Sequence, residues 1–113
     1  MIESCCFGNI VIDGRKYTFD LVIYPDGRVV GPWYRKSGHR LSSGDIRELI
    51  RSGPDVIVAG TGISGLVKPE KELERLLSER GIEFIAAPNE EAMKVYNGLS
   101  SRRSVGACFH LTC

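Results

Sequence analysis

The stretch DVIVAGTGISG, from Asp55 to Gly65, decides the fold of this chain. Its apolar run, Val56–Ala59, is bounded by Pro54 and Gly60, which predicts a strand buried on both faces of a parallel or mixed sheet. We expect this strand to lie at the centre of the sheet. The glycines that follow have the G-x-G-x-x-G spacing with which a backbone can hold phosphate at the start of a helix.

The context of this motif argues against a dinucleotide site. In dinucleotide folds the strand passes almost directly into the helix, so that the second glycine lies beneath the pyrophosphate. Here Leu66, Val67 and Lys68 come before the predicted helix start at Pro69. The ribose-binding acid expected about 20 residues further on is also missing, since the next predicted strand ends at Ala86. We interpret the glycines as a structural turn that lets backbone approach backbone closely.

The first third of the chain predicts an antiparallel meander. Phe7–Ile12 and Lys16–Tyr24 are rich in β-branched and aromatic residues, and the turn signal Asp13-Gly14 joins them. Pro25-Asp26-Gly27 then turns the chain into a third predicted strand, Arg28–Trp33.

Helices and strands alternate in the rest of the chain. Gly53-Pro54 ends the first predicted helix, and Pro69 with the acids after it begins the second. The order β-β-β-α-β-α-β-α-β predicts a single α/β domain, residues 1–113, with a mixed central sheet and covering helices. The predicted elements are helices at Asp45–Ser52, Pro69–Arg80 and Asn89–Leu99, the last with Ala92, Met93 and Tyr96 inward, and strands at Ile82–Ala86 and Val105–Thr112.

Length and charge exclude several classes of protein. With 113 residues, 42% hydrophobic and 26% charged, the chain has the size and composition of one globular domain. Its 15 basic and 14 acidic residues give a net charge of +1, so we expect no binding to nucleic acid or to a membrane. The N-terminus lacks the positive charge of a signal peptide, and no run approaches the roughly 18 apolar residues of a membrane helix. We therefore expect a cytoplasmic protein.

Four cysteines and two histidines raise the question of a metal site or a cysteine nucleophile. On a strand, Cys108 and His110 would share one face and Cys113 would point to the other, and the paired C-x-x-C spacing of structural zinc sites is absent. A nucleophilic cysteine would need a base, His39 or His110, within hydrogen-bond reach. We expect reduced thiols, no metal, no cofactor and no catalytic residue.

The segment Trp33–Arg40, which we call the basic loop, gathers glycine, serine and positive charge and has no periodicity. Its cations and aromatic residues can bind phosphate or stack on a base. The alternative, which we favour, is a solvated loop whose Trp33 and Tyr34 pack on the edge of the core. If a small anion binds, we expect it between this loop and Gly60–Gly65, the glycine turn. The candidate ligand-binding residues are Arg35, Lys36, His39, Arg40, Gly60, Thr61 and Gly62.

Five blocks of the sequence together resemble the adipogenesis-associated Mth-type domain family, whose relatives include a mitochondrial complex I assembly factor. The blocks are FGNIVIDG, WYRKSGHRL, DVIVAGTGISG, EAMKVYNGL and CFHLTC. The resemblance extends over nearly the whole chain and implies a compact α/β domain with a mixed central sheet. It implies no catalytic residue set, and the roles of the eukaryotic relatives imply assembly or regulation.

Two functions of different classes remain open. The first is a non-enzymatic interaction or assembly domain with a protein partner, and it leaves a homodimer open. The second is a small-molecule binder or enzyme that takes an anionic ligand or nucleotide at the glycine turn and the basic loop. The sequence favours the first, because no catalytic motif has the context that it needs.

Overall fold

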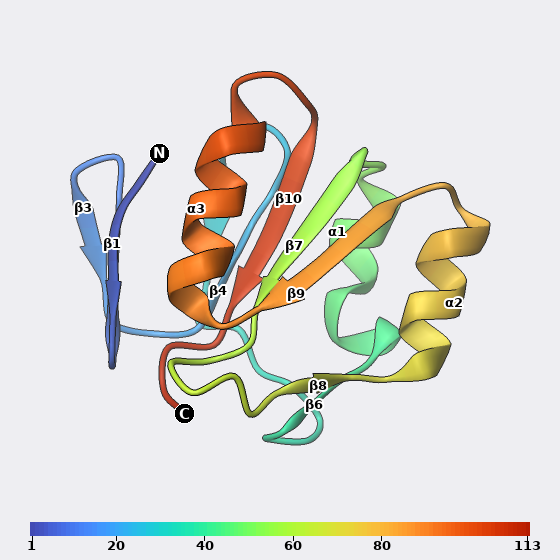
Figure 1. Ribbon diagram of the computed structural model, residues 1–113, viewed down its shortest axis with the longest axis horizontal. Helices are drawn as coiled ribbons and strands as arrows, with labels where there is room; N and C mark the ends of the chain where they lie inside the picture. The colour runs from blue at the N-terminus through green and yellow to red at the C-terminus, as the bar shows by residue number, and fades with distance from the viewer.

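A five-stranded mixed sheet forms the centre of the computed structural model, which describes residues 1–113 (Figure 1). Along the sheet lie β5 (Val29–Val30), β4 (Leu21–Ile23), β10 (Val105–Phe109), β7 (Val56–Gly60) and β9 (Glu83–Ala87). The last three strands are parallel to one another. β4 is antiparallel to both β10 and β5. The predicted mixed sheet is therefore confirmed.

The central sheet separates two cores, because alternate residues of a strand point to opposite faces. All five residues of β7 and all five of β10 are buried. Val56 and Val58 belong to one core, whereas Ile57 and Ala59 belong to the other. The apolar run after Pro54 is thus a strand buried on both faces, as predicted, although β10 and not β7 holds the middle position in the sheet.

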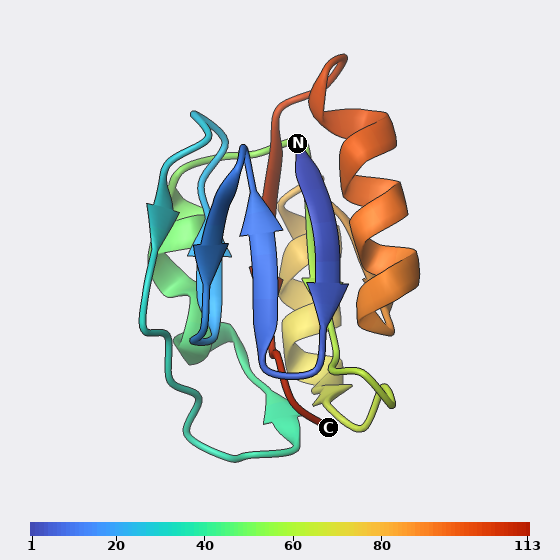
Figure 2. The same ribbon diagram turned by 90° about the vertical axis from the view of Figure 1, so that its left-hand side faces the viewer.

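A smaller antiparallel sheet and one helix cover the first face (Figures 1 and 2). The small sheet is the meander β1 (Ile2–Cys6), β2 (Asn9–Ile12) and β3 (Arg15–Tyr17), and the helix is α3 (Asn89–Ser100). Asn97 joins the two, since its side-chain amide accepts from the N–H of Ile2 and donates to the carbonyl of Ile2, both at 2.8 Å. The small sheet and α3 therefore bury one continuous core against the central sheet.

Short helices cover the second face. They are η1 (Ser43–Ile46), α1 (Arg47–Arg51) and α2 (Lys71–Glu79), and a two-stranded parallel sheet of β6 (Arg40–Leu41) and β8 (Lys68–Pro69) lies beside them. The longest helix of the chain has 12 residues, and no helix is long and apolar enough to cross a membrane.

Several boundaries differ from the predicted ones. The predicted strand Lys16–Tyr24 is divided between β3 and β4, because the chain leaves the small sheet there and enters the central one. Ile2–Cys6 is a strand that the sequence analysis missed. The prediction that Pro69 begins a helix is wrong. Pro69 ends β8, where the N–H of Glu70 binds the Leu41 carbonyl at 2.8 Å, and the helix starts at Lys71.

The final strand is also shorter than predicted, and this difference matters for the site. β10 ends at Phe109, so that residues 110–113 continue beyond the sheet as an extended tail. His110 stays anchored to the end of β7, because its N–H donates to the Gly60 carbonyl at 3.1 Å.

Candidate functional site

The carboxyl ends of the parallel strands collect most of the residues that the sequence analysis singled out (Figure 1). In open α/β sheets, ligands bind beyond these ends. Here the glycine turn follows β7 and the tail His110–Cys113 follows β10. The basic loop reaches the same end, where the N–H of Lys68 donates to the His39 carbonyl at 2.8 Å.

A half-buried ionic cluster of Asp20, Arg35 and His110 connects the basic loop to the end of β10. Asp20 Oδ2 lies 3.1 Å from Arg35 Nη1 and 2.7 Å from His110 Nδ1. Asp20 Oδ1 accepts the backbone N–H of Leu111 at 2.8 Å. Arg35 has only 5% of its side chain exposed and also donates to the Gly38 carbonyl at 3.0 Å. We refer to these three side chains as the ionic cluster.

The ionic cluster holds Asp20 in its charged form. Partial burial acts to raise the pKa of Asp20, but hydrogen bonds from His110, from the Leu111 N–H and from Arg35 outweigh it, so that the pKa lies below its ordinary value. Two groups contact Nδ1 of His110, Asp20 Oδ2 at 2.7 Å and Arg35 Nη2 at 3.1 Å. The other ring nitrogen, Nε2, lies 3.1 Å from Oγ1 of Thr112.

Asp20, His110 and Thr112 thus form a chain of carboxylate, imidazole and hydroxyl, an order that hydrolases use to activate a nucleophile. Such a nucleophile also needs oxyanion donors and a cavity for the substrate. The larger hollows described below are lined by other residues. The arrangement is suited instead to fastening the basic loop and the C-terminal tail to the sheet.

The glycine turn is closely packed by other parts of the chain. A side chain on Gly60 would overlap the ring of Phe109 and the amide of Asn89, and a Cβ on Gly62 would lie within 2.6 Å of the Cys113 backbone. These close contacts explain why glycine occupies both positions, and they are consistent with a structural turn. The N–H groups of Thr61, Gly62 and Ile63 donate to Ala87 O at 2.9 Å, Asn89 Oδ1 at 3.0 Å and Thr112 O at 2.7 Å. An anion bound here would have to displace these acceptors.

The predicted ligand-binding residues lie at one end of the fold but in different surroundings. Arg35 belongs to the ionic cluster, and Arg40 forms an ion pair with Glu70 at 3.2 Å. Lys36 and Arg40 line a polar hollow of about 370 Å³ together with Ser37, Ser42, Asp45 and Glu70. Neither His39 nor Gly60, Thr61 and Gly62 lines this hollow. Ligand binding by the seven residues as one set remains a prediction.

A protein-family model described as "Protein of unknown function (DUF498/DUF598)" matches residues 2–110 of the chain. The chain belongs to the DUF498/DUF598 family. This match confirms the Mth-like domain of unknown function that the sequence blocks indicate.

Solved structures share the fold of this DUF498/DUF598 chain. A conserved hypothetical protein from Pyrococcus horikoshii is 30% identical, with a TM-score of 0.85 over 100% of this chain and 99% of that chain. A protein named MT938 is also 30% identical, with a TM-score of 0.83 over 100% and 98% of the two chains. A protein described as an outer membrane protein from Bartonella henselae has the same fold at 22% identity, with a TM-score of 0.80 over 99% and 94%.

The cysteines of this DUF498/DUF598 chain are all free. Burial raises the pKa of Cys108 to about 12 and the pKa of the half-buried Cys5 to about 11. Both thiols are therefore protonated at neutral pH and weakly nucleophilic. No group of three or more His, Cys, Asp and Glu side chains is arranged to hold a metal ion.

Sequence reasoning missed two residues that organise this end of the fold. Asn89 was expected only as the first residue of a helix, but its buried side-chain amide also binds the Gly62 N–H at 3.0 Å and the His110 carbonyl at 2.6 Å. Asp20 was counted only as part of a strand. The signal for Asp20 was its place as the one acid in the apolar segment Lys16–Tyr24.

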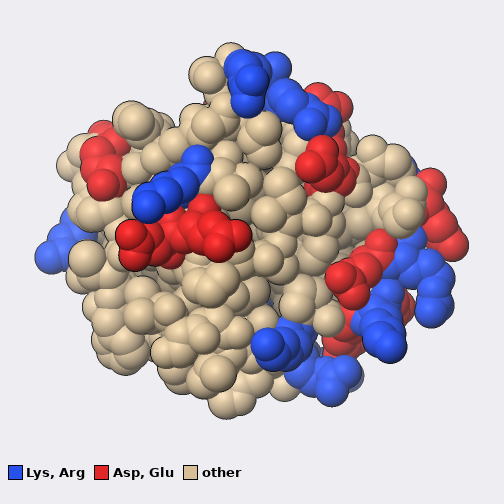
Figure 3. Space-filling view, in the orientation of Figure 1, with Lys and Arg blue, Asp and Glu red and all other residues tan.

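Exposed apolar side chains gather around the C-terminal tail. Phe7, Ile63 and Leu66 are 66%, 39% and 46% exposed, and we call them the C-terminal apolar surface. Backbone hydrogen bonds place their segments on the tail. Gly8 N binds Leu111 O at 2.8 Å, and the N–H groups of Ile63 and Leu66 bind Thr112 O and Cys113 O at 2.7 and 3.3 Å. Figure 3 shows no charged side chain over this lower left part of the molecule.

Proposed function

We propose that this DUF498/DUF598 chain is a non-enzymatic interaction or assembly domain, acting in the cytoplasm, that binds a protein partner through the C-terminal apolar surface. The observation that carries the proposal is the exposure of Phe7, Ile63 and Leu66 around one tail, where Figure 3 shows no Lys, Arg, Asp or Glu side chain. Exposed apolar side chains that adjoin one another mark interaction sites, whereas single scattered ones do not.

The partner's surface should be apolar and uncharged as well. Burying an unpaired charge against Phe7, Ile63 and Leu66 would be unfavourable, because none of these three side chains could pair with it. Because only 39–66% of each side chain is exposed, burying the remainder would contribute about 1–2 kcal/mol for each. The three side chains would therefore act as anchors, and contacts around them must supply the rest of the free energy that offsets the entropic cost of binding.

The arrangement of the reactive groups supports a non-enzymatic role. Asp20, Arg35 and His110 mainly satisfy one another and the backbone. The thiols of Cys5 and Cys108 stay protonated, because burial raises the pKa of each.

The test compares the natural chain with the double variant Phe7→Ser/Leu66→Ser as bait in an extract of the source cells. Val30→Ser is the matched control, because Val30 is 43% exposed but lies on β5, an edge strand of the central sheet, and is not part of the C-terminal apolar surface. We expect a partner that the natural chain and Val30→Ser retain, that the double variant loses, and that binds again when both proteins are purified.

Light scattering measures the molar mass of the purified chain and so tests whether the partner is a second copy of this chain. A dimer that the double variant dissociates supports the proposal with this chain as its own partner. A monomer together with the same set of captured proteins for all three baits overturns it.

A second candidate, binding of a small anion, rests on the polar hollow that contains Lys36 and Arg40. Arg40 is paired with Glu70, which leaves Lys36 as the cation available to an anion. We expect pyrophosphate to raise the melting temperature of the natural chain and of Lys16→Ala on β3, but not of Lys36→Ala. An equal effect on all three chains would reject this candidate.

A further inference from the structure

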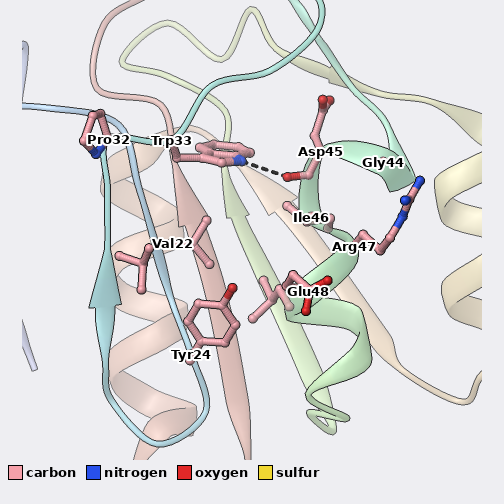
Figure 4. Close-up of a pocket in the computed structure, with 11 residues that line it drawn as sticks. Val22, Tyr24, Pro32, Trp33, Gly44, Asp45, Ile46, Arg47 and Glu48 are labelled. Atoms are coloured by element: carbon pink, nitrogen blue, oxygen red, sulfur yellow. Dashed lines mark hydrogen bonds between the residues drawn. The ribbon is translucent and has the colours of Figure 1, made fainter.

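An apolar cavity of about 380 Å³ lies on the second face of the central sheet, between β4–β5 and the η1–α1 helices (Figure 4). It exists because α1 has five residues and β5 has two, so that the outer edge of the sheet is only partly covered. Val22, Trp33, Ile46 and Leu49 line it. Its volume is within the range of roughly 300–1,000 Å³ typical of small-molecule sites.

The wall of this cavity is held in place before any ligand arrives. The indole N–H of Trp33 donates to the Asp45 carbonyl at 2.9 Å, which fixes the ring across the gap between loop and helix. The Asp45 carboxylate points away from the cavity in Figure 4. Its two oxygens accept the N–H groups of Lys36 and Ser42 at 3.0 and 2.9 Å. A preformed wall lowers the entropic cost of binding.

A second hollow, of about 410 Å³, adjoins the apolar cavity, and the two share Tyr24 and Glu48. Arg28 and Arg51 also line this second hollow, which is distinct from the polar hollow of Lys36 and Arg40. Glu48 is paired with Arg51 at 3.4 Å. Arg28, and Arg47 in the lining of the cavity, have no carboxylate partner among the ion pairs of the chain. Figure 4 shows the Arg47 side chain pointing away from the cavity, so Arg28 is the cation available to a ligand.

The aromatic rings favour an anion over a cation. Rings attract cations to their faces, but Arg28 already lies 4.5 Å from the centroid of the Tyr24 ring and Arg35 lies 5.1 Å from that of Trp33. Each ring thus already has a protein cation over it. A bound organic cation would also meet Arg28 in the hollow that adjoins the cavity.

We propose that the two hollows form one binding site for an amphipathic carboxylate, with its apolar part in the cavity beside Trp33 and its carboxylate on Arg28. The apolar cavity is complementary to the hydrocarbon part of such a molecule, and Arg28 is complementary to its carboxylate. Tyr24 lines both hollows, so one small molecule can occupy both. The site contains none of Phe7, Ile63 and Leu66, so it is independent of the proposed protein-binding surface.

The test uses Trp33 as the reporter, because it is the one tryptophan of the chain. Three probes share a phenylbutyl group and differ in the head group: 4-phenylbutyrate, 4-phenylbutanol and 4-phenylbutylamine. We expect 4-phenylbutyrate to change Trp33 fluorescence saturably, with a Kd on the order of 1 mM for so small a ligand. The alcohol should bind about tenfold more weakly, since it lacks the charge-assisted hydrogen bond, and the amine should bind most weakly.

Variants connect the binding to Arg28. We expect Arg28→Gln to weaken 4-phenylbutyrate about tenfold and leave the alcohol unchanged, and Arg28→Lys to restore part of the affinity. Arg15→Gln is the matched control, because Arg15 also lies over a tyrosine ring, 5.4 Å from the centroid of Tyr17. Val30→Phe, which places a ring at the cavity wall, should weaken every probe.

Several results would overturn the proposal. They are an unchanged Trp33 spectrum at saturating 4-phenylbutyrate, equal binding of the three probes, tighter binding of the amine, or equal effects of Arg28→Gln and Arg15→Gln. None of these results bears on the capture of a partner by Phe7 and Leu66.

Discussion

Replacing Asp20 with asparagine should strongly destabilise the fold, because it removes the acceptor that two donors share. The carboxylate lies 3.1 Å from Arg35 Nη1 and 2.7 Å from His110 Nδ1, whereas an asparagine would present its own N–H₂ group to one of them. Arg35 would keep its charge with only 5% of its side chain exposed. Loss of one partner from a buried pair costs about 3–5 kcal/mol.

The lower end of that range applies, because 21% of the Asp20 side chain is exposed and water can replace part of the lost interaction. We therefore expect the free energy of unfolding to fall by about 3 kcal/mol, and the melting temperature by roughly 12–18 °C. Urea denaturation with a constant m-value measures the first quantity, and calorimetry measures the second. Asp13→Asn is the control, since Asp13 pairs with the N-terminus where both groups are about three-quarters exposed, and should cost under about 1 kcal/mol.

A second variant shows that the loss comes from the stranded cation. Adding Arg35→Met to Asp20→Asn should recover part of the stability, because replacing both members of a buried pair by uncharged groups is often neutral. A cost below about 1 kcal/mol for Asp20→Asn, or no recovery in the double variant, would refute the structural role of the ionic cluster.

Three further predictions concern Asp20, the glycines and the cysteines. The pKa of Asp20 is lower in the folded state, so the stability that its charge contributes is fully present above the unfolded pKa of about 3.9. This stability is lost as the pH falls through the folded pKa. Acid titration monitored by circular dichroism should therefore destabilise the natural chain more than Asp20→Asn. Gly62→Ala should lower the free energy of unfolding by more than about 2 kcal/mol, because Gly62 has a φ of +107° and the Cys113 backbone lies beside it. Gly98→Ala, in open space on α3, should raise the free energy of unfolding by about 0.5–1 kcal/mol. Urea denaturation of both variants measures the difference. A thiol reagent at neutral pH should modify the exposed Cys6 rapidly and the buried Cys108 only on unfolding, which mass spectrometry of the labelled peptides detects.

The fold was largely predictable because its signals are local. The run Val56–Ala59 and the helix Asn89–Leu99 are each defined by apolar spacing and flanking turns, and both lie where we expected them. Lys16–Tyr24 was harder, because strand composition says nothing about which sheet a residue joins. Its division between two sheets depends on packing against β10, a strand about ninety positions later in the chain.

The site was less predictable, because its contacts join residues far apart in sequence. Arg35 was identified by its charge within a basic loop, but its partner Asp20 lies across a strand and its neighbour His110 lies 75 positions away. Asn89 looks like a helix cap in sequence and binds two other segments in space. Composition identified the residue types, whereas the pairing required the folded sheet.

The tail explains why binding functions would lie beside the usual ligand position of an open α/β sheet. That position is the crevice beyond the carboxyl ends of β7 and β10, and here the carbonyls of Thr112 and Cys113 accept the N–H groups of Ile63 and Leu66 that border it. An anion would have to compete with hydrogen bonds formed within one chain, which have no entropic cost of association. The outer faces of the same segments remain free and carry apolar side chains. The segments that pack on this tail thus present the surface that we assign to a protein partner.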